Sequence, residues 1–268
     1  MTKTRRFRFG GEQVMFAYTW LIILWLVAPI LIMIAFGFNN PHGRYNQTWQ
    51  GFTFKWYSQV FGISDLTKAL ITSLVIAVVS SVISGALGTG IGYALGRWRF
   101  RGSSTLNFIM FTTISSPELI MGISLLTLFV TLGAGLGATT ITIAHVMFSV
   151  SFVATVVRAR VVTLDRSIEE AASDLGAGPW TTFWKITFPI IMPAVMSGVL
   201  LAFVLSIDDF VVTNFTAGTT VTFPLWIWGA TRVGLPPQVN VMGTLIFAAG
   251  LLIAVIANLR SRAKAKRD

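Results

Sequence analysis

Long apolar runs alternate with short polar segments along the whole chain. A membrane-spanning α-helix needs roughly 20 consecutive apolar residues, and six of the runs are long enough. The pattern therefore predicts an all-α integral membrane protein with six transmembrane helices. We expect these helices near Val14–Phe38, Ala69–Leu95, Leu106–Leu132, Ala138–Val157, Ile190–Val212 and Val241–Leu259.

The composition supports a membrane protein. Of the 268 residues, 54% are hydrophobic and only 11% are charged, whereas charged residues make up about a quarter of a typical soluble domain. A soluble fold of this size would have too few polar side chains to cover its surface. The chain has no cysteine, which excludes disulfides and thiolate metal sites.

The net charge of +10 is distributed unevenly between the polar segments. Sixteen of the 20 Lys and Arg residues fall on one side of the predicted membrane, and four fall on the other. The positive-inside rule then predicts that both termini lie in the cytoplasm. Because topology explains the basic charge, we expect no nucleic-acid partner. The first span is too long for a secretory signal core, so we expect it to remain as an anchor.

The connection between the first two spans, residues 39–68, is rich in aromatic side chains. Aromatic residues with polar tips prefer the interface between membrane and water. The loop is therefore expected either to form an interfacial belt or to act as a docking ledge for an outside partner. The aromatic residues are Trp49, Phe52, Phe54, Trp56, Tyr57 and Phe61.

Small residues recur at every fourth position of the second span. Positions four apart lie on one face of a helix, and small side chains there let two membrane helices approach closely. We expect this face to pack against another helix. Its residues are Ser80, Ser84, Gly88, Gly92 and Gly96.

No pattern in the chain indicates chemistry of its own. There is no G-x-x-x-x-G-K-[ST] phosphate loop, no Cys/His cluster for a metal, and no paired nucleophile and base. We therefore expect no enzyme activity, no catalytic residue and no metal site. His145, inside the fourth span, is interpreted as a hydrogen-bonded polar group rather than a ligand.

The segment between the fourth and fifth spans is short, acidic and amphipathic. Ser167 and Glu170 have the spacing of a capping box, Gly176 suits the left-handed turn that ends a helix, and Pro179 suits the first turn of another. Such short helices are not stable alone in water. The apolar stripe must pack on its own bundle, lie on the lipid surface, or insert into a groove of a cytoplasmic partner. The stripe consists of Ile168, Ala171, Ala172 and Leu175.

The same segment resembles a known family. Glu170-Ala171-Ala172, Gly176, Ile186 and Pro189 match the E-A-A-x3-G-x9-I-x-L-P loop of ATP-binding-cassette (ABC) importer permeases, with Phe188 replacing the leucine. The resemblance implies the type I importer permease fold, in which this loop is a coupling helix that docks on the ATPase. ATP and Mg would then belong to the partner ATPase, and this chain would hold no cofactor. The implied coupling residues are Glu169, Glu170, Ala171, Ala172, Leu175, Gly176, Ile186 and Pro189.

A narrower resemblance covers most of the chain. Segments 49–61, 97–102, 115–130, 205–218 and 223–240 look like the spermidine/putrescine importer permeases, and most like the second permease of such systems. The resemblance implies a companion permease in a heterodimer, two ATPase subunits, an extracytoplasmic substrate-binding protein and a location in the inner or plasma membrane.

The expected organisation has three parts. Residues 1–68 form the N-terminal tail, the first span and the outer loop, residues 69–259 form the permease domain, and residues 260–268 form a basic cytoplasmic tail.

Carboxylates inside the spans are candidates for the translocation pathway. Glu118 follows Pro117 near the centre of the third span, and Asp208 and Asp209 lie towards the end of the fifth. A charged side chain at the bilayer centre is costly and usually faces a cavity or a partner. No Lys or Arg lies inside a predicted span, so a passing polyamine ammonium is a candidate partner. The alternatives are that the Asp pair caps a helix or hydrogen-bonds locally, or that one of the two carboxyl groups is protonated. The predicted pathway residues are Asp208, Asp209, Glu118, Phe210 and Trp226.

Two other functions stay open from the sequence. The same architecture could import another solute, such as another organic cation, sulfate or thiosulfate, although carboxylates in the spans favour a cation. A self-sufficient secondary transporter is the other class. Such transporters often contain internal repeats, and we see none.

Overall fold

The computed structural model describes residues 11–43 and 45–265, apart from the side chains of 253–254 and 256–265. This part of the chain is helical, with an isolated antiparallel bridge between Asn39 and Phe52, which confirms the all-α class. It divides into two compact units, Met1–Ser64 with Ala230–Asp268, and Asp65–Gly229. The basic side chains predicted in the two tails lie outside the described residues.

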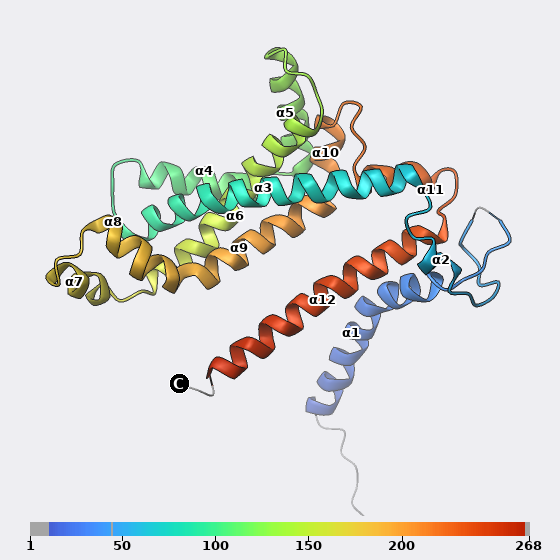
Figure 1. Cartoon of the computed structure of the whole chain (residues 1–268), viewed down its shortest axis with the longest axis horizontal. Helices are drawn as coiled ribbons and strands as arrows, with labels where there is room; N and C mark the ends of the chain where they lie inside the picture. Colours follow the sequence, from blue (N-terminus) through green and yellow to red (C-terminus); the bar gives the residue numbers. More distant parts are fainter. Residues whose placement is uncertain (1–10, 44, 266–268) are drawn as a thin grey trace, which may run out of the picture. The chain divides into compact units, whose positions relative to one another are not determined.

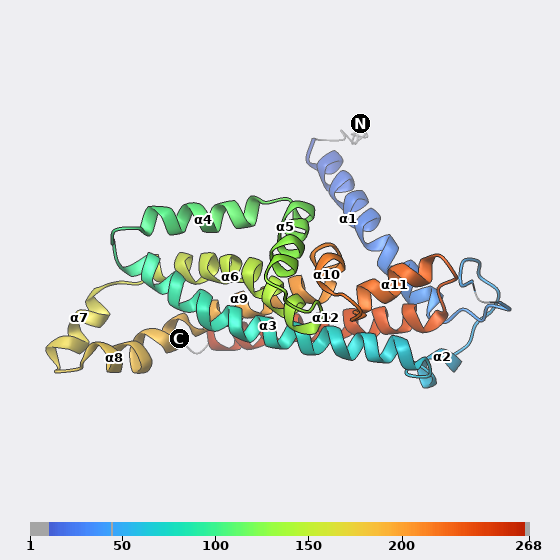
Figure 2. The same cartoon turned by 90° about the horizontal axis from the view of Figure 1, so that it is seen from above.

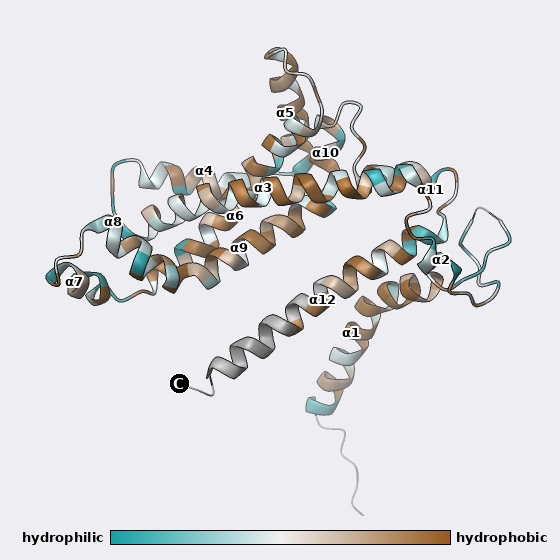
Figure 3. Ribbon diagram, viewed as in Figure 1, coloured by the Kyte–Doolittle hydropathy of each residue, from teal (hydrophilic) through white to brown (hydrophobic). Residues whose placement is uncertain are grey.

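The first unit contains α1 (Gly11–Phe36), α2 (Lys55–Ser58) and α12 (Pro237–Ala265). No residue of α1 is buried, and the helix is hydrophobic along most of its length (Figure 3). It packs on α12 where Gly243 leaves room, because a Cβ there would lie 2.7 Å from Met33 Sδ. A helix so apolar and so exposed is suited to lipid or to another membrane chain.

The loop of the first unit is held by one asparagine. The Asn39 side chain donates to Asn46 Oδ1 at 2.7 Å and accepts from the Gln50 amide at 2.7 Å. The Trp56 indole donates to the Asn39 carbonyl at 2.7 Å. Beside these bonds, the rings of Phe38 and Phe52 stack with centroids 5.4 Å apart. The aromatic loop is therefore ordered by its own contacts, and the choice between interfacial belt and docking ledge stays open.

The second unit is built on α3 (Ser64–Arg97), α6 (Ala138–Val162) and α9 (Phe188–Asp208), which run alongside one another (Figure 1). A Cβ at Gly92 would lie 2.5 Å from the Ala154 carbonyl oxygen, and one at Gly88 would lie 2.6 Å from Val153 Cβ. The small-residue face of α3 therefore packs directly on α6, as predicted. Between α6 and α9, the fully buried core includes Val157 and Ile191.

The third predicted span, Leu106–Leu132, is wrong as one continuous helix. It forms α4 (Ser103–Ser115) and α5 (Glu118–Thr131), which meet at an angle of 109° (Figure 2). Ser116 has the extended ψ of 133° that a following proline favours, and Pro117 has no N–H to continue the helix. As a consequence, Glu118 lies in the first turn of α5 and not in the middle of a helix.

Four described helices are long and apolar enough to cross a membrane, and the bent α4–α5 pair makes five if it counts as one span. The sixth predicted span, Val241–Leu259, falls in α12, whose described side chains form a shorter apolar stretch, Pro237–Leu252. The rest of that span lies outside the described side chains. The count of six and the three-part organisation therefore stay predictions.

Candidate functional site

The first candidate site is the coupling segment, residues 167–189. It contains α7 (Ser167–Asp174), α8 (Pro179–Thr182) and a π-helical turn (Phe183–Thr187) that leads into α9. Gly176 has a φ of +81°, the left-handed conformation that glycine adopts without strain. Pro179 occupies the first turn of α8. The predicted arrangement of helix, glycine turn and helix is confirmed, and it lies at one end of the second unit (Figures 1 and 2).

The predicted capping box is wrong. Arg166, not Ser167, precedes the helix, and no side chain caps it in the predicted way. Asp165 Oδ1 instead accepts from the Ser167 amide at 3.0 Å. The backbone and side-chain hydrogen bonds of Ser167 hold the pKa of Asp165 below its ordinary value. The local turn thus satisfies the amide before the helix begins, which leaves both glutamates free for other contacts.

Glu169 joins the coupling segment to the end of α3 and to the start of α9. Its Oε2 accepts from Arg97 Nε at 2.7 Å and lies 2.5 Å from Arg97 Nη2, and its Oε1 accepts from Thr187 Oγ1 at 2.9 Å. Arg166 donates to the Arg97 carbonyl at 3.2 Å. We call these four residues the clamp. The Arg97 side chain is only 8% exposed, so this ion pair is shielded from water far more than an ordinary surface pair.

The sequence reasoning missed Arg97. A single arginine at the end of an apolar span is most simply read as a topology signal, and its partner is 72 positions away. The only signal is that Glu169 and Arg97 both adjoin predicted spans on the same side of the membrane.

The apolar stripe of the coupling segment does not pack as one face on its own bundle. Ala172 is buried, but Leu175 is 90% exposed and Ile168 is 41% exposed. Trp180 of α8 is also largely exposed. Of the other predicted coupling residues, Glu170, Ala171, Gly176 and Pro189 are exposed and Ile186 is half-buried. Part of the stripe therefore forms an apolar surface that the described residues of the chain do not cover.

The second candidate site is a cavity of about 340 Å³, which we call the pathway cavity. It lies where the bend between α4 and α5 meets α6, the end of α9 and α10 (Val211–Thr216). Three carboxylates line it, together with aromatic, aliphatic and hydroxyl side chains. The lining residues that concern us are Glu118, Asp208, Asp209, Phe148, Phe152, Phe210, Met121, Thr113 and Ser116.

Four of the five predicted pathway residues line this cavity. The fifth, Trp226, is half-buried on α11 (Phe223–Thr231) and is not part of the lining. Phe210 also contacts that helix, because its ring centroid lies 5.2 Å from that of Trp228.

The carboxylates of the cavity are in two different states. Glu118 and Asp208 are exposed and form no ion pair within the described part of the chain. The Asp209 side chain is only 5% exposed, and its Oδ2 accepts from both the amide and the hydroxyl of Thr213 at 2.7 Å. Asp209 therefore caps the first turn of α10, which was the alternative considered from the sequence.

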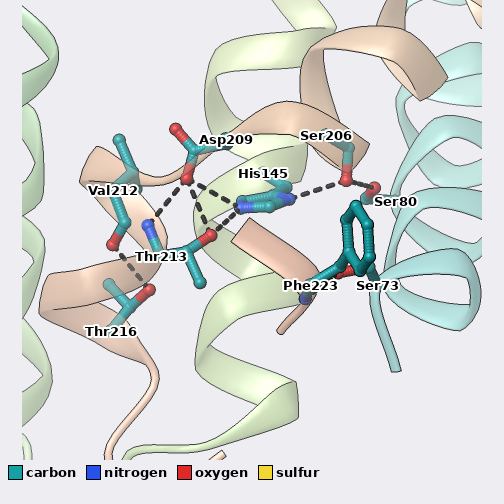
Figure 4. A network of polar contacts seen from close by, with 9 residues as sticks. All are labelled: Ser73, Ser80, His145, Ser206, Asp209, Val212, Thr213, Thr216 and Phe223. Atoms are coloured by element: carbon teal, nitrogen blue, oxygen red, sulfur yellow. Dashed lines mark hydrogen bonds and ion pairs between the residues drawn. The ribbon is translucent and has the colours of Figure 1, made fainter. Parts of the chain in front are cut away.

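Asp209 also has a basic partner, contrary to the expectation that the spans supply none. His145 Nε2 lies 3.3 Å from Asp209 Oδ2 (Figure 4). The expectation counted only Lys and Arg. His145 itself is hydrogen-bonded as predicted, with Ser206 Oγ at 2.7 Å and Thr213 Oγ1 at 3.0 Å.

The apolar spans, the exposed amphipathic segment and the acidic cavity together define a helical membrane protein with a polar interior site. Comparison with known proteins identifies its class. Residues 88–264 match the family described as binding-protein-dependent transport system inner membrane component. The chain belongs to this family.

Several relatives are similar over nearly their whole length. The chain is 35% identical to the spermidine/putrescine transport system permease protein PotC of Haemophilus influenzae, covering 92% of this chain and 95% of that protein. It is 38% identical to PotC of Escherichia coli strain K12, covering 91% and 92%. It is also 38% identical to the putrescine transport system permease protein PotI of the same strain, covering 90% and 89%.

Solved structures show the same fold. A chain of a bacterial ABC transporter involved in the import of the acidic polysaccharide alginate superposes with a TM-score of 0.65, at 18% identity, covering 95% of this chain and 98% of that one. A chain of the MetNI methionine ABC transporter gives 0.61 at 15% identity, covering 73% and 93%. The predicted ABC importer permease fold is therefore confirmed.

Proposed function

We propose that this chain is a permease subunit of an ATP-driven importer of polyamines, namely spermidine and putrescine. The observation that carries the proposal is the 35–38% identity, over at least 90% of the chain, to permeases named for those substrates. The chain would supply half of the translocation pathway, and a companion permease would supply the other half.

The chemistry of the pathway cavity supports a polyamine. A polyamine carries ammonium groups separated by methylene segments. Glu118 and Asp208 offer carboxylates to the ammonium groups, and Phe148 and Phe210 offer apolar ring faces to the methylenes and π-faces to the cations. Charge interactions are stronger in such a low-dielectric site than in water. An anion such as sulfate would meet carboxylates here and be repelled, so the remaining alternative is another organic cation.

The exposed face of the coupling segment supports a partner ATPase. Leu175 and Trp180 are too large and too exposed to be covered by the chain's own described residues. A groove beside them, lined by Tyr93 and Trp98 among others, adds further apolar surface. Amphipathic helices commonly insert such faces into a groove of a partner. ATP and Mg would bind the two ATPase subunits, and the clamp would carry their movement to α3 and α9.

The charge distribution supports an orientation with both termini in the cytoplasm, where the ATPase would dock, and with the substrate-binding protein on the other side. Reporter fusions after Lys264 and within residues 45–60 test this orientation. We expect a cytoplasmic signal from the first and an extracytoplasmic signal from the second. Equal signals from both would overturn it.

Uptake of labelled spermidine and putrescine tests the proposed function. A strain that lacks this chain should lose uptake, and the wild-type chain on a plasmid should restore it. A chain with Gly176→Asp is the matched control and should fail to restore uptake. Aspartate is strained at a φ of +81° and should disrupt the turn of the coupling segment without changing the cavity. Unchanged polyamine uptake in the deletion strain, in the absence of another polyamine importer, would contradict the proposal.

A further inference from the structure

His145 occupies the centre of a buried polar network that links four helices (Figure 4). It belongs to α6 and is 1% exposed. One ring nitrogen meets Ser206 of α9, and the other meets Thr213 of α10. Ser80 of α3 extends the network by donating to Ser206 Oγ at 3.0 Å. A buried imidazole with both nitrogens satisfied is a costly group to remove, because its partners would lose their hydrogen bonds.

The donors and acceptors of this network fit one tautomer of a neutral His145 ring. The Thr213 hydroxyl donates to Asp209 Oδ2, so Thr213 Oγ1 must accept from His145 Nε2. With the proton on Nε2, Nδ1 of a neutral imidazole is an acceptor and receives the Ser206 hydroxyl proton. In this arrangement Nε2 directs its proton at the Thr213 hydroxyl, which in turn donates to Asp209.

As a result, the two carboxylate oxygens of Asp209 differ in their contacts. Oδ2 receives the amide and hydroxyl of Thr213 and faces His145 Nε2. Oδ1 points away from His145 and Thr213 (Figure 4), and Asp209 is one of the residues that line the pathway cavity. The carboxylate therefore cannot rotate freely without breaking the contacts of Oδ2.

We propose that His145 is a positioning residue of the translocation pathway, which holds Oδ2 of Asp209 so that Oδ1 is presented to a passing ammonium group. This inference rests on the proposed function and deepens it. Asp208, one residue earlier, offers an exposed carboxylate to the same cavity, whereas Asp209 offers one that is held by its neighbours. Glu118 of α5 also lines the cavity, so the ammonium groups of one polyamine could bind carboxylates of both kinds.

A purely structural role for His145 predicts a different behaviour. If the network only packs α3, α6, α9 and α10 together, disturbing it should lower the amount of assembled complex and should act independently of the charge on Asp209. A positioning role acts through Asp209 and should disappear when that carboxylate is absent. Residues of one network can be non-additive for either reason, so the double-mutant comparison is made on uptake per assembled complex, and the amount of assembled complex is measured beside it.

The test uses the complete importer reconstituted into vesicles, with uptake of labelled putrescine and spermidine normalised to assembled complex. His145→Gln keeps a donor near the position of Nε2, and His145→Asn places its polar atoms near Nδ1 instead. Ser149→Ala is the matched control, because Ser149 is a buried residue one turn further along α6 whose hydroxyl has no hydrogen-bond partner among the described residues. Each histidine variant is made in the wild-type background and with Asp209→Asn, and ATP hydrolysis is measured with the loaded binding protein.

We expect His145→Asn to lower normalised uptake about tenfold, the effect expected for one hydrogen bond to a charged group. His145→Gln should restore most of it, and Ser149→Ala should match the wild type. With Asp209→Asn already present, His145→Asn should cause no further loss. ATP hydrolysis per complex should fall less than uptake.

Losses that multiply in the double variant, or equal losses in His145→Gln and His145→Asn, would overturn the positioning role. Full normalised uptake by His145→Asn would overturn it as well. Absence of polyamine uptake by the wild-type complex would instead overturn the proposed function and this inference with it.

Discussion

The coupling segment and the pathway cavity each contain two adjacent acidic residues, and in each pair the two residues are in opposite states. Glu169 is held by Arg97 and Thr187, whereas Glu170 is exposed. Asp209 is held by Thr213 and His145, whereas Asp208 is exposed. One member of each pair is held by other side chains of the fold, and its neighbour is exposed.

The two pairs differ in the base that holds them. Arg97 is always charged, and its ion pair lies at the end of a span. His145 lies within the bundle and can satisfy its hydrogen bonds as a neutral ring. The Arg97 pair therefore always carries charge, whereas the hydrogen bonds of His145 do not require one. The two members of each acidic pair therefore cannot be assigned the same role from their residue type alone.

The largest effect is expected from breaking the clamp. Arg97→Ala leaves the carboxylate of Glu169 without its cation. Removing one member of a fully buried pair costs about 3–5 kcal/mol, and we expect about 2–3 kcal/mol here because Glu169 keeps some contact with water. Thermal unfolding of the purified complex measures the loss. Arg97→Glu combined with Glu169→Arg should recover part of it, and no recovery would count against a direct ion pair.

A second prediction concerns the exposed glutamate. Glu170→Lys should abolish transport while the chain still accumulates in the membrane, because Glu170 is exposed and has no ion pair among the described residues. Copurification of the ATPase with the membrane complex measures the docking. Glu170→Gln is the matched control and should retain more ATPase than the charge reversal. Wild-type copurification and transport by Glu170→Lys would remove this residue from the docking surface.

A third prediction separates the two aspartates. Asp208→Asn should lower polyamine uptake severalfold without changing assembly, because asparagine keeps the shape and removes only the charge. Asp209→Asn should lower both uptake and thermal stability, since it also weakens the cap on α10; caps contribute about 1 kcal/mol. Uptake and melting temperature are measured on the same preparations. Equal stability losses in both variants would contradict the difference between them.

The smallest effect is expected at Asp165, which precedes the coupling segment. Its pKa is lower in the folded protein than in an unfolded chain, so its contribution is present above the unfolded pKa and is lost as the pH falls through the folded pKa. Asp165→Asn should therefore reduce the slope of stability against pH only in strongly acidic buffer. Because the carboxylate is fully exposed, a large change near neutral pH would show that it has a partner outside the chain.

The sequence predicted much of this fold because membrane spans and the coupling loop are local patterns. Apolar length located the helices, and the glycine and proline positions in residues 176–179 predicted the turn and the second short helix. The bend at Pro117 was not predicted, because proline is tolerated inside membrane helices when neighbours satisfy the freed backbone groups. Local sequence alone does not show whether those neighbours exist.

The partners of the acidic residues could not be predicted from the sequence for a related reason. Glu169 meets Arg97, and Asp209 meets His145, across 72 and 64 positions of the chain. Such pairings depend on how helices are placed side by side. Only Lys and Arg were expected as cationic partners, whereas histidine can also pair with a carboxylate.

The central claim is that each acidic pair divides into a held and a free residue, and one matched measurement tests it directly. Glu169→Gln, Glu170→Gln, Asp208→Asn and Asp209→Asn are compared in reconstituted complexes for thermal unfolding and for polyamine uptake per assembled complex. We predict that the held residues, Glu169 and Asp209, change both quantities, and that the free residues, Glu170 and Asp208, change uptake alone. Lower stability in the variants of the free residues, with unchanged stability in those of the held residues, would contradict the account.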